Sequence, residues 1–249
     1  MRVLIIPAAG RGSRLGTSTP KALVRVNGRP MLDHLAELYS PLVQHIVVVA
    51  HPSFASDVTA WAAGRGNVSV AEQPQPTGML DAILAAASDV RARRPNEVWI
   101  TWADQVGVRS DTLRRVDAAM ASTPIPALAL PTVRKRDPYT HFERDPSGRI
   151  ARLLQKREGD AMPPEGESDM GLFALRADTF ERHLEDYARE VVPGAGTGER
   201  NFVPFVPWIA QRSTVVTVAC TDSREAIGIN TPEELATVEQ WLRTRGPGA

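Results

Sequence analysis

The first 120 residues alternate short apolar runs with segments whose apolar residues recur at helical spacing. This pattern predicts strands at residues 3–7, 45–50, 68–71 and 98–102, and helices at residues 30–39, 57–63, 78–88 and 110–120. Strands that alternate with helices are typical of βαβ crossovers. We therefore expect an α/β protein with a Rossmann-like, mixed but mostly parallel sheet flanked by helices.

The second half of the chain is patterned differently, because several apolar runs follow one another without a helix between them. The expected strands are residues 127–132, 149–154, 171–176 and 215–220, and the expected helices are residues 178–187, 202–211 and 232–242, the last one capped by Thr231. Residues 192–200 are glycine-rich and predict a loop. No linker separates the halves, so we expect a single domain over residues 1–249 in which the second half extends the first sheet.

Composition excludes several classes of protein. The 249 residues carry 29 Lys+Arg and 29 Asp+Glu, and a neutral chain lacks the basic excess of a nucleic-acid-binding protein. No run reaches the roughly 18 apolar residues that span a membrane. The N-terminus has no signal-peptide pattern, and the one cysteine, Cys220, cannot form an internal disulfide. We expect a cytoplasmic protein in which Cys220 is a small core residue.

The strand predicted at residues 3–7 leads into the sequence PAAGRGSRLGTSTPK. Small residues let backbone N–H groups approach a polyphosphate, and Arg14 and Lys21 add fixed positive charge. The run lacks the Gly-Lys-Ser/Thr of a Walker A loop. Gly10 and Gly12 fit a G-x-G-x-x-G dinucleotide loop, but leucine occupies the third glycine position. An ordinary strand-to-helix turn explains the glycines and leaves Arg14 and Lys21 unexplained.

This run, A-A-G-x-G-x-R with a Pro-Lys pair whose lysine follows Arg14 by seven residues, resembles the signature of the sugar-phosphate nucleotidyltransferases, or pyrophosphorylases. The family includes glucose-1-phosphate thymidylyltransferases and the uridyltransferase domain of the bifunctional GlcNAc-1-phosphate enzyme. The resemblance implies a GT-A-like nucleotidyltransferase fold, an NTP-binding half at residues 1–125 and an acceptor-binding half at residues 126–249. It also implies that the loop wraps an NTP triphosphate and that Mg²⁺ is the cofactor.

Further motifs extend the resemblance and assign roles to single residues. The segment QPQPTG gives Gln73 a base-reading role, since an amide offers both a donor and an acceptor, and places Gly78 against the nucleotide. Asp104 follows a strand end, where ligands bind in α/β sheets, and would hold Mg²⁺ with Asn230 of the segment AIGINT. The implied catalytic residues are Arg14, Lys21 and Asp104, and the implied nucleotide-binding residues are Ala8, Ala9, Gly10, Gly12, Gln73 and Gly78.

The acceptor half departs from the family pattern. Gln155 stands where the family usually has a glutamate that holds sugar hydroxyls, and Asp169 stands where it has Asn or Thr. The segment YTHFER, with His141, replaces a glycine-containing segment near the sugar. Either Lys156 or Arg157 matches the lysine that binds the acceptor phosphate. The implied acceptor-binding residues are His141, Gln155, Lys156 and Asp169, and these departures leave the acceptor open.

The resemblance implies transfer of a nucleoside monophosphate from an NTP to a sugar 1-phosphate or a similar phosphorylated acceptor, with release of pyrophosphate. One alternative is a cytidylyl- or guanylyltransferase that acts on a non-sugar phosphate or phosphonate. Another is a non-catalytic nucleotide-binding regulatory subunit, which the presence of Arg14, Lys21 and Asp104 together disfavours. The expected partners are an NTP and a phosphorylated small molecule, without nucleic acid or membrane, and a homodimer is a further expectation.

Overall fold

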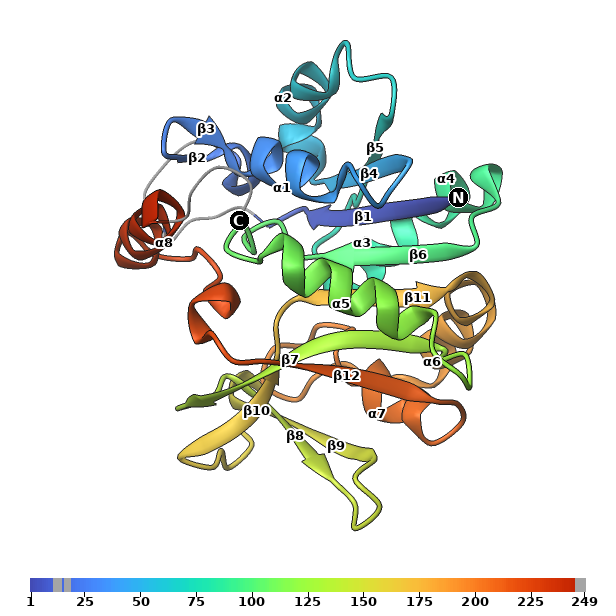
Figure 1. Cartoon of the computed structure of the whole chain (residues 1–249). Coiled ribbons are helices and arrows are strands. Elements are labelled where there is room, and N and C mark those ends of the chain that lie inside the picture. Colours follow the sequence, from blue (N-terminus) through green and yellow to red (C-terminus); the bar gives the residue numbers. More distant parts are fainter. Residues whose placement is uncertain (11–14, 16–18, 245–249) are drawn as a thin grey trace.

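One sheet organises the molecule, and both halves of the chain contribute strands to it. The computed structural model describes residues 1–10, 15 and 19–244, so the predicted loop residues Gly12 and Arg14 lie outside the described residues. The strands of the sheet are β1 (Arg2–Ala8), β4 (His45–Ala50), β5 (Val68–Glu72), β6 (Glu97–Thr101), β7 (Leu128–Arg136), β10 (Glu165–Asp169), β11 (Leu172–Arg176) and β12 (Val215–Cys220). Their order is β10-β7-β11-β6-β1-β4-β5, with β12 paired to β7 (Figure 1).

The strand directions confirm a mixed, mostly parallel sheet. β1 is parallel to β4 and β6, β4 to β5, and β12 to β7. β11 runs antiparallel to β6 and β7, and β10 antiparallel to β7. The chain passes from β1 to β4 and β5 on one side and then returns to β6 on the other side of β1. This reversal creates a crevice beyond the carboxyl ends of β1 and β6, where α/β sheets bind ligands.

Helices cover both faces of the sheet, and alternate residues of β1 show why. Leu4 and Ile6 pack into one core while Val3 and Ile5 pack into the other, and all four are fully buried. Because successive strand residues point to opposite faces, a strand buried on both faces reads as a continuous apolar run. The first core is covered by α1 (Met31–Tyr39), α2 (Pro52–Ala62), α5 (Ser110–Met120) and α8 (Pro232–Thr244). The second is covered by α3 (Met79–Ala85), α4 (Ala87–Arg93), α6 (Leu184–Glu190) and α7 (Phe205–Ala210).

Smaller elements lie outside the main sheet. A hairpin of β8 (Thr140–Arg144) and β9 (Ile150–Gln155) extends below the sheet in Figure 1, and β2 (Arg25–Val26) pairs with β3 (Arg29–Pro30). The short helical turns include η2 (Lys21–Leu23), η3 (Lys156–Glu158), η4 (Thr179–His183) and η5 (Ser223–Ala226). Among the described residues, no helix is long and apolar enough to cross a bilayer.

Some elements differ from the sequence prediction. The helix expected at residues 78–88 is two helices that meet at Ala86, and the helix expected from residue 57 begins at Pro52, after a His51 cap that accepts from Ser53 N at 3.1 Å. Strands β8 and β10 were not predicted. In β10 the inward positions are Gly166 and Ser168, which give no apolar signal.

Candidate active site

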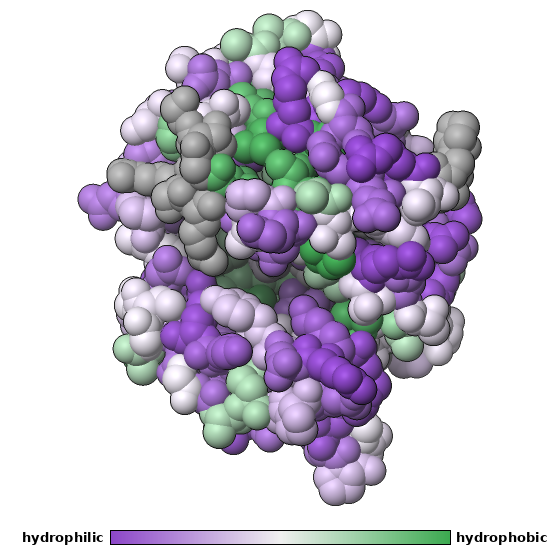
Figure 2. Space-filling view, turned by 90° about the vertical axis from the view of Figure 1, so that its left-hand side faces the viewer, coloured by the Kyte–Doolittle hydropathy of each residue, from purple (hydrophilic) through white to green (hydrophobic). Residues whose placement is uncertain are grey.

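A cleft of about 790 Å³ lies at the edge of the sheet where β1 and β6 end. Figure 2 faces this edge and shows the hollow between the upper and lower parts of the molecule. Predicted residues from both halves of the chain line it: Ala9, Gly10, Gln73, Gly78, Asp104, Gln155, Asp169 and Asn230. A second hollow of about 710 Å³ is lined by residues such as Asn96, Arg176 and Thr214 and contains none of the predicted site residues.

Lys21 and the two predicted metal ligands meet in this region. The Lys21 ammonium donates to Asp104 Oδ2 at 2.5 Å and to Asn230 Oδ1 at 2.7 Å. Only 17% of the Lys21 side chain and 16% of the Asp104 side chain are exposed. Asp104 and Asn230 lie 83 and 209 positions after Lys21 in the sequence. The fold therefore brings the predicted catalytic lysine and the predicted metal ligands to one point at the topological switch.

A cap at the start of α8 orients Asn230. Glu234 Oε2 accepts from Asn230 N at 2.7 Å and from Thr231 N at 3.0 Å, and Glu234 N donates to Thr231 Oγ1 at 3.3 Å. This reciprocal pattern is a capping box and confirms Thr231 as the cap. Asn230 Nδ2 donates to Gly228 O at 3.1 Å, which leaves Oδ1 directed at Lys21.

The chemistry of these donors fits Mg²⁺. A carboxylate oxygen and an amide oxygen converge on a single ammonium, so their lone pairs already face a common cation. Oxygen atoms are the ligands that Mg²⁺ prefers, and it is commonly held by one or two carboxylates together with phosphates and waters. Within the described part of the chain, no group of three or more His, Cys, Asp or Glu could hold a metal by itself. Asp104 and Asn230 would therefore share the ion with substrate phosphates.

The part of the cleft that is predicted to bind the nucleotide, named the nucleotide end here, is built around Gln73. This side chain is 5% exposed, and its Nε2 donates to Gly78 O at 3.0 Å. Gly78 adopts a φ of +127°, and a Cβ there would lie 2.6 Å from Arg200 N. The close approach of Gly78 to Arg200 explains this glycine without a ligand, so its predicted contact with the nucleotide stays a prediction. Ala8 is buried at the end of β1, beside the cleft rather than in its lining.

The acceptor end contains only part of the predicted set. Gln155 and Asp169 line the cleft, whereas His141 and Lys156 do not. His141 Nδ1 accepts from Glu167 N at 3.0 Å, which joins β8 to β10, and Lys156 is exposed. Arg157, the other residue weighed for the acceptor phosphate, lines the cleft.

Sequence reasoning missed several lining residues at this end. They are Trp102, Gln105, Lys135, Glu199 and Asn201. Lys135 lies in a charged run that reads as a solvated surface, and Trp102 reads as core. Both interpretations are incomplete, because each side chain is half-buried and faces the cleft. Trp99, by contrast, is fully buried.

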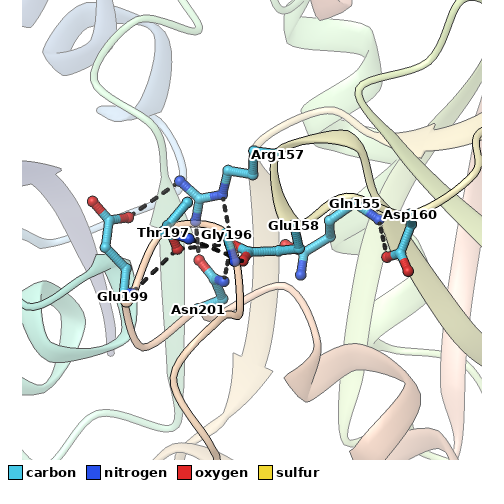
Figure 3. Close-up of polar contacts among 8 residues, drawn as sticks. All are labelled: Gln155, Arg157, Glu158, Asp160, Gly196, Thr197, Glu199 and Asn201. Atoms are coloured by element: carbon cyan, nitrogen blue, oxygen red, sulfur yellow. Dashed lines mark hydrogen bonds and ion pairs between the residues drawn. The ribbon is translucent and has the colours of Figure 1, made fainter.

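Glu158 ties the acceptor end together (Figure 3). Its carboxylate accepts from Gly196 N at 2.9 Å, from Thr197 Oγ1 at 2.8 Å and from Asn201 Nδ2 at 2.9 Å. Burial raises the pKa of the Glu158 carboxyl, but the hydrogen bonds from Thr197, Asn201 and Gly196 outweigh it and hold the pKa below its ordinary value of 4.5. Arg157 donates to Glu199 at 3.2 Å and also to Asn201. This network fixes the loop at residues 194–201 against η3.

The same segment also contacts the nucleotide end. Arg200 N donates to Thr77 O at 2.8 Å, Leu80 N donates to Arg200 O at 3.1 Å, and the Arg200 guanidinium pairs with Asp81. Residues 194–201 therefore connect the segment that is predicted to read the base to η3. The glycine-rich pattern predicted a loop here but gave no sign of its contacts.

The fold and the site define a class of protein, the nucleotidyltransferases. The chain belongs to the family described as the MobA-like NTP transferase domain, which matches residues 4–165. This finding confirms the class that the glycine loop predicted.

The chain is also similar to particular curated proteins. It is 28% identical over 253 residues to the bifunctional protein GlmU of Solibacter usitatus, covering 97% of this chain and 52% of that protein. It is 30% identical over 251 residues to the same protein of Anaeromyxobacter sp., covering 97% and 49%. The chain thus spans about half the length of these curated relatives.

The fold is also similar to that of a solved structure from Bacillus anthracis. That structure is described as a glucose-1-phosphate thymidylyltransferase in complex with a sucrose. The TM-score is 0.77 at 16% identity, and the similarity covers 100% of this chain and 98% of the other. This similarity confirms the Rossmann-like nucleotidyltransferase fold.

Proposed function

We propose that this chain transfers a nucleoside monophosphate from an NTP to a sugar 1-phosphate or a similar phosphorylated acceptor and releases pyrophosphate. The observation that carries the proposal is the convergence of Lys21, Asp104 and Asn230 at the switch point. The position of Asp104 and Asn230 in one cleft with Gln73 and with the acceptor-end residues supports a reaction between two bound phosphates. The names of the relatives support the same reaction class.

In this reaction a phosphate oxygen of the acceptor attacks the α-phosphorus in line. A new P–O bond forms, the bond to the β-phosphate oxygen breaks, and pyrophosphate leaves with that electron pair. The attacking oxygen is already anionic near neutral pH, so no general base is required. The protein's task is to position two anions against their mutual repulsion and to stabilise the spreading charge.

Each region of the cleft has a part in this task. Lys21 stabilises phosphate charge, and Gln73 reads the base. The predicted loop residues Ala8, Ala9, Gly10, Gly12 and Arg14 would bind the triphosphate, as the loop motif implies. Arg157 and Lys135 hold the acceptor phosphate, and Gln155 and Asp169 bind the rest of the acceptor. Asp104 and Asn230 would hold Mg²⁺, which neutralises and polarises phosphate oxygens when bound.

A pyrophosphate-release assay with four NTPs and a panel of sugar 1-phosphates tests this proposal. We expect release with at least one pair, and loss of release in Asp104→Ala with an unchanged thermal unfolding midpoint. Asp111→Ala is the matched control, because Asp111 is an acidic residue that pairs with Arg114 on the exposed surface of α5. Undiminished turnover in Asp104→Ala would overturn the assignment.

The divergence of the acceptor end favours a second candidate of the same chemistry, a cytidylyl- or guanylyltransferase with a non-sugar phosphate or phosphonate acceptor. Adding non-sugar phosphates and phosphonates to the acceptor panel distinguishes this candidate from the first one. Binding of an NTP without release from any pair indicates a regulatory subunit. A cytoplasmic location and a homodimer stay predictions.

A further inference from the structure

The acceptor end of the cleft holds a carboxylate without a cation. Asp169 accepts from Thr140 Oγ1 at 2.8 Å and from Gly171 N at 3.1 Å. Within the described part of the chain, no Lys, Arg or His forms an ion pair with it, although it is half-buried and lines the cleft. A charge removed from water is costly unless a counter-charge compensates it.

Gln105 provides a second, independent sign of a ligand at the same place. It is 7% exposed and lines the cleft, and its Oε1 accepts no hydrogen bond from any residue that the structure describes. Buried side-chain oxygens nearly always have a donor. Gln105 Oε1 and the Asp169 carboxylate would therefore both be satisfied by a ligand that donates hydrogen bonds.

Gly171 brings these two groups and an aromatic ring together. Its backbone, at a φ of +66°, donates to Asp169, and a Cβ on this glycine would lie 2.8 Å from Gln105 Cγ and the same distance from Trp102 Cγ. Trp102 packs on Phe173 at a centroid distance of 5.2 Å and still lines the cleft. An indole ring attracts cations through its π-face.

Positive side chains lie elsewhere in the same cleft. Lys135 lines it and pairs with no carboxylate among the described residues, and Arg157 faces it from η3. An uncompensated carboxylate and an uncompensated ammonium in one cleft fit a ligand that bears both signs of charge. A phosphate ester of an uncharged polyol would bring no positive charge and would leave Asp169 without a counter-charge.

We propose, resting on the function proposed above, that the acceptor carries an ammonium group in addition to its phosphate. Asp169, Gln105 and the Trp102 ring bind the ammonium group, which supplies both a positive charge and hydrogen-bond donors. Lys135 and Arg157 bind the phosphate. The substrate class is thus an amino-substituted phosphate, either an amino sugar 1-phosphate or an open-chain aminoalkyl phosphate or phosphonate.

The test compares acceptors that differ only in an amino or a hydroxyl group. The pairs are glucosamine 1-phosphate with glucose 1-phosphate, and 2-aminoethyl phosphate with 2-hydroxyethyl phosphate. We expect kcat/KM to be at least about tenfold higher for the amino member of one pair, the ratio expected of a hydrogen-bonded charge. In Asp169→Asn this advantage should fall to less than about threefold, because the rate with the amino member falls further than the rate with the hydroxyl member.

Glu165→Gln is the matched control, because Glu165 is an exposed acid on the same strand. We expect it to keep the full preference. The comparison in the unmodified chain does not depend on any variant folding correctly. Equal rates for both members of each pair, or equal losses for both in Asp169→Asn, would overturn the inference.

Titration calorimetry with each acceptor, in the presence of an NTP, separates this inference from the proposed function. If no pair releases pyrophosphate but the amino members bind and Asp169→Asn abolishes that binding, the site assignment stands and the proposed reaction fails. If only hydroxyl acceptors react, the reaction stands and the ammonium site is refuted. If no member of either pair reacts or binds, both are refuted.

Discussion

The two ends of the cleft are assembled in different ways. The nucleotide end is built on residues that follow strands directly: Gly10 after β1, Gln73 after β5 and Asp104 after β6. The acceptor end draws on side chains from scattered segments, and the network of Glu158, Arg157 and Asn201 holds it in shape. Under the proposed function, the parallel strands would place the reaction centre, whereas specificity would depend on loop contacts that are free to diverge.

Removing the lysine at the nucleotide end should have the largest effect. Lys21→Ala takes away an ammonium that contacts both Asp104 and Asn230. We expect kcat to fall about 10³-fold, the upper range for losing one electrostatic group in a preorganised site. The loss should be the same with every acceptor, as pyrophosphate release will show. A loss of kcat that varies with the acceptor would contradict the claim that Lys21 acts at the nucleotide end alone.

Gly78→Ala should destabilise the junction of the two ends. An added methyl would meet Arg200 N at 2.6 Å, and the φ of +127° adds backbone strain. We expect a loss of about 2–4 kcal/mol in the free energy of unfolding, measured by denaturant titration. Gly64→Ala is the control, since Gly64 also has a positive φ, of +80°, but has no atom within 4 Å. It should cost only about 1 kcal/mol, and an equal cost for both variants would contradict the contact with Arg200.

Variants of Arg157 and of its neighbour Lys156 should have a smaller effect, which is confined to the acceptor end. Arg157→Ala should raise the KM for the acceptor about tenfold and leave the KM for the NTP within about twofold, because a charge-assisted contact is lost at one end only. Lys156→Ala should change both values less than about twofold, since that exposed side chain lies outside the cleft lining. Initial-rate kinetics give both KM values for each variant. A larger rise in the acceptor KM for Lys156→Ala than for Arg157→Ala would assign the acceptor phosphate to Lys156 instead.

The smallest expected effect is a change in how stability depends on pH. The pKa of Glu158 is lower in the folded chain than its ordinary value of 4.5, so its hydrogen bonds stabilise the fold above that pH. This stabilisation is lost as the pH falls through the folded-state pKa. Glu158→Gln should therefore reduce stability at neutral pH and flatten the fall of the unfolding midpoint below pH 4.5. If the unfolding midpoint of Glu158→Gln falls below pH 4.5 as steeply as that of the unmodified chain, the loop at residues 194–201 is held by other contacts.

Sequence reasoning succeeded where a motif is contiguous or follows a strand. The apolar runs of β1, β4 and β6 predict the parallel core, and a position just beyond a strand end predicts that Asp104 lies in the cleft, where the structure places it. The cap at Thr231 was also recognisable, since its partner Glu234 lies three residues on.

The acceptor end gave no comparable signal. Lys135 lies in a charged run, and its position facing the cleft depends on the pairing of β7 with β10, a strand without apolar periodicity. Gln105 is marked by an oxygen that has no donor among the described residues, a property of packing rather than of sequence. His141 was predicted to bind the acceptor, but its ring accepts a hydrogen bond from Glu167 N and so joins β8 to β10.

The most direct test of the central claim follows the α-phosphorus itself. The chain is incubated with Mg²⁺, an acceptor and an NTP that is radiolabelled at the α-phosphate, and the products are separated. We predict that the label appears in a nucleoside-diphospho product in a one-to-one ratio with released pyrophosphate, and that Asp104→Ala forms none. Labelled nucleoside monophosphate without acceptor-linked product, or product formation that persists in Asp104→Ala, would contradict the account.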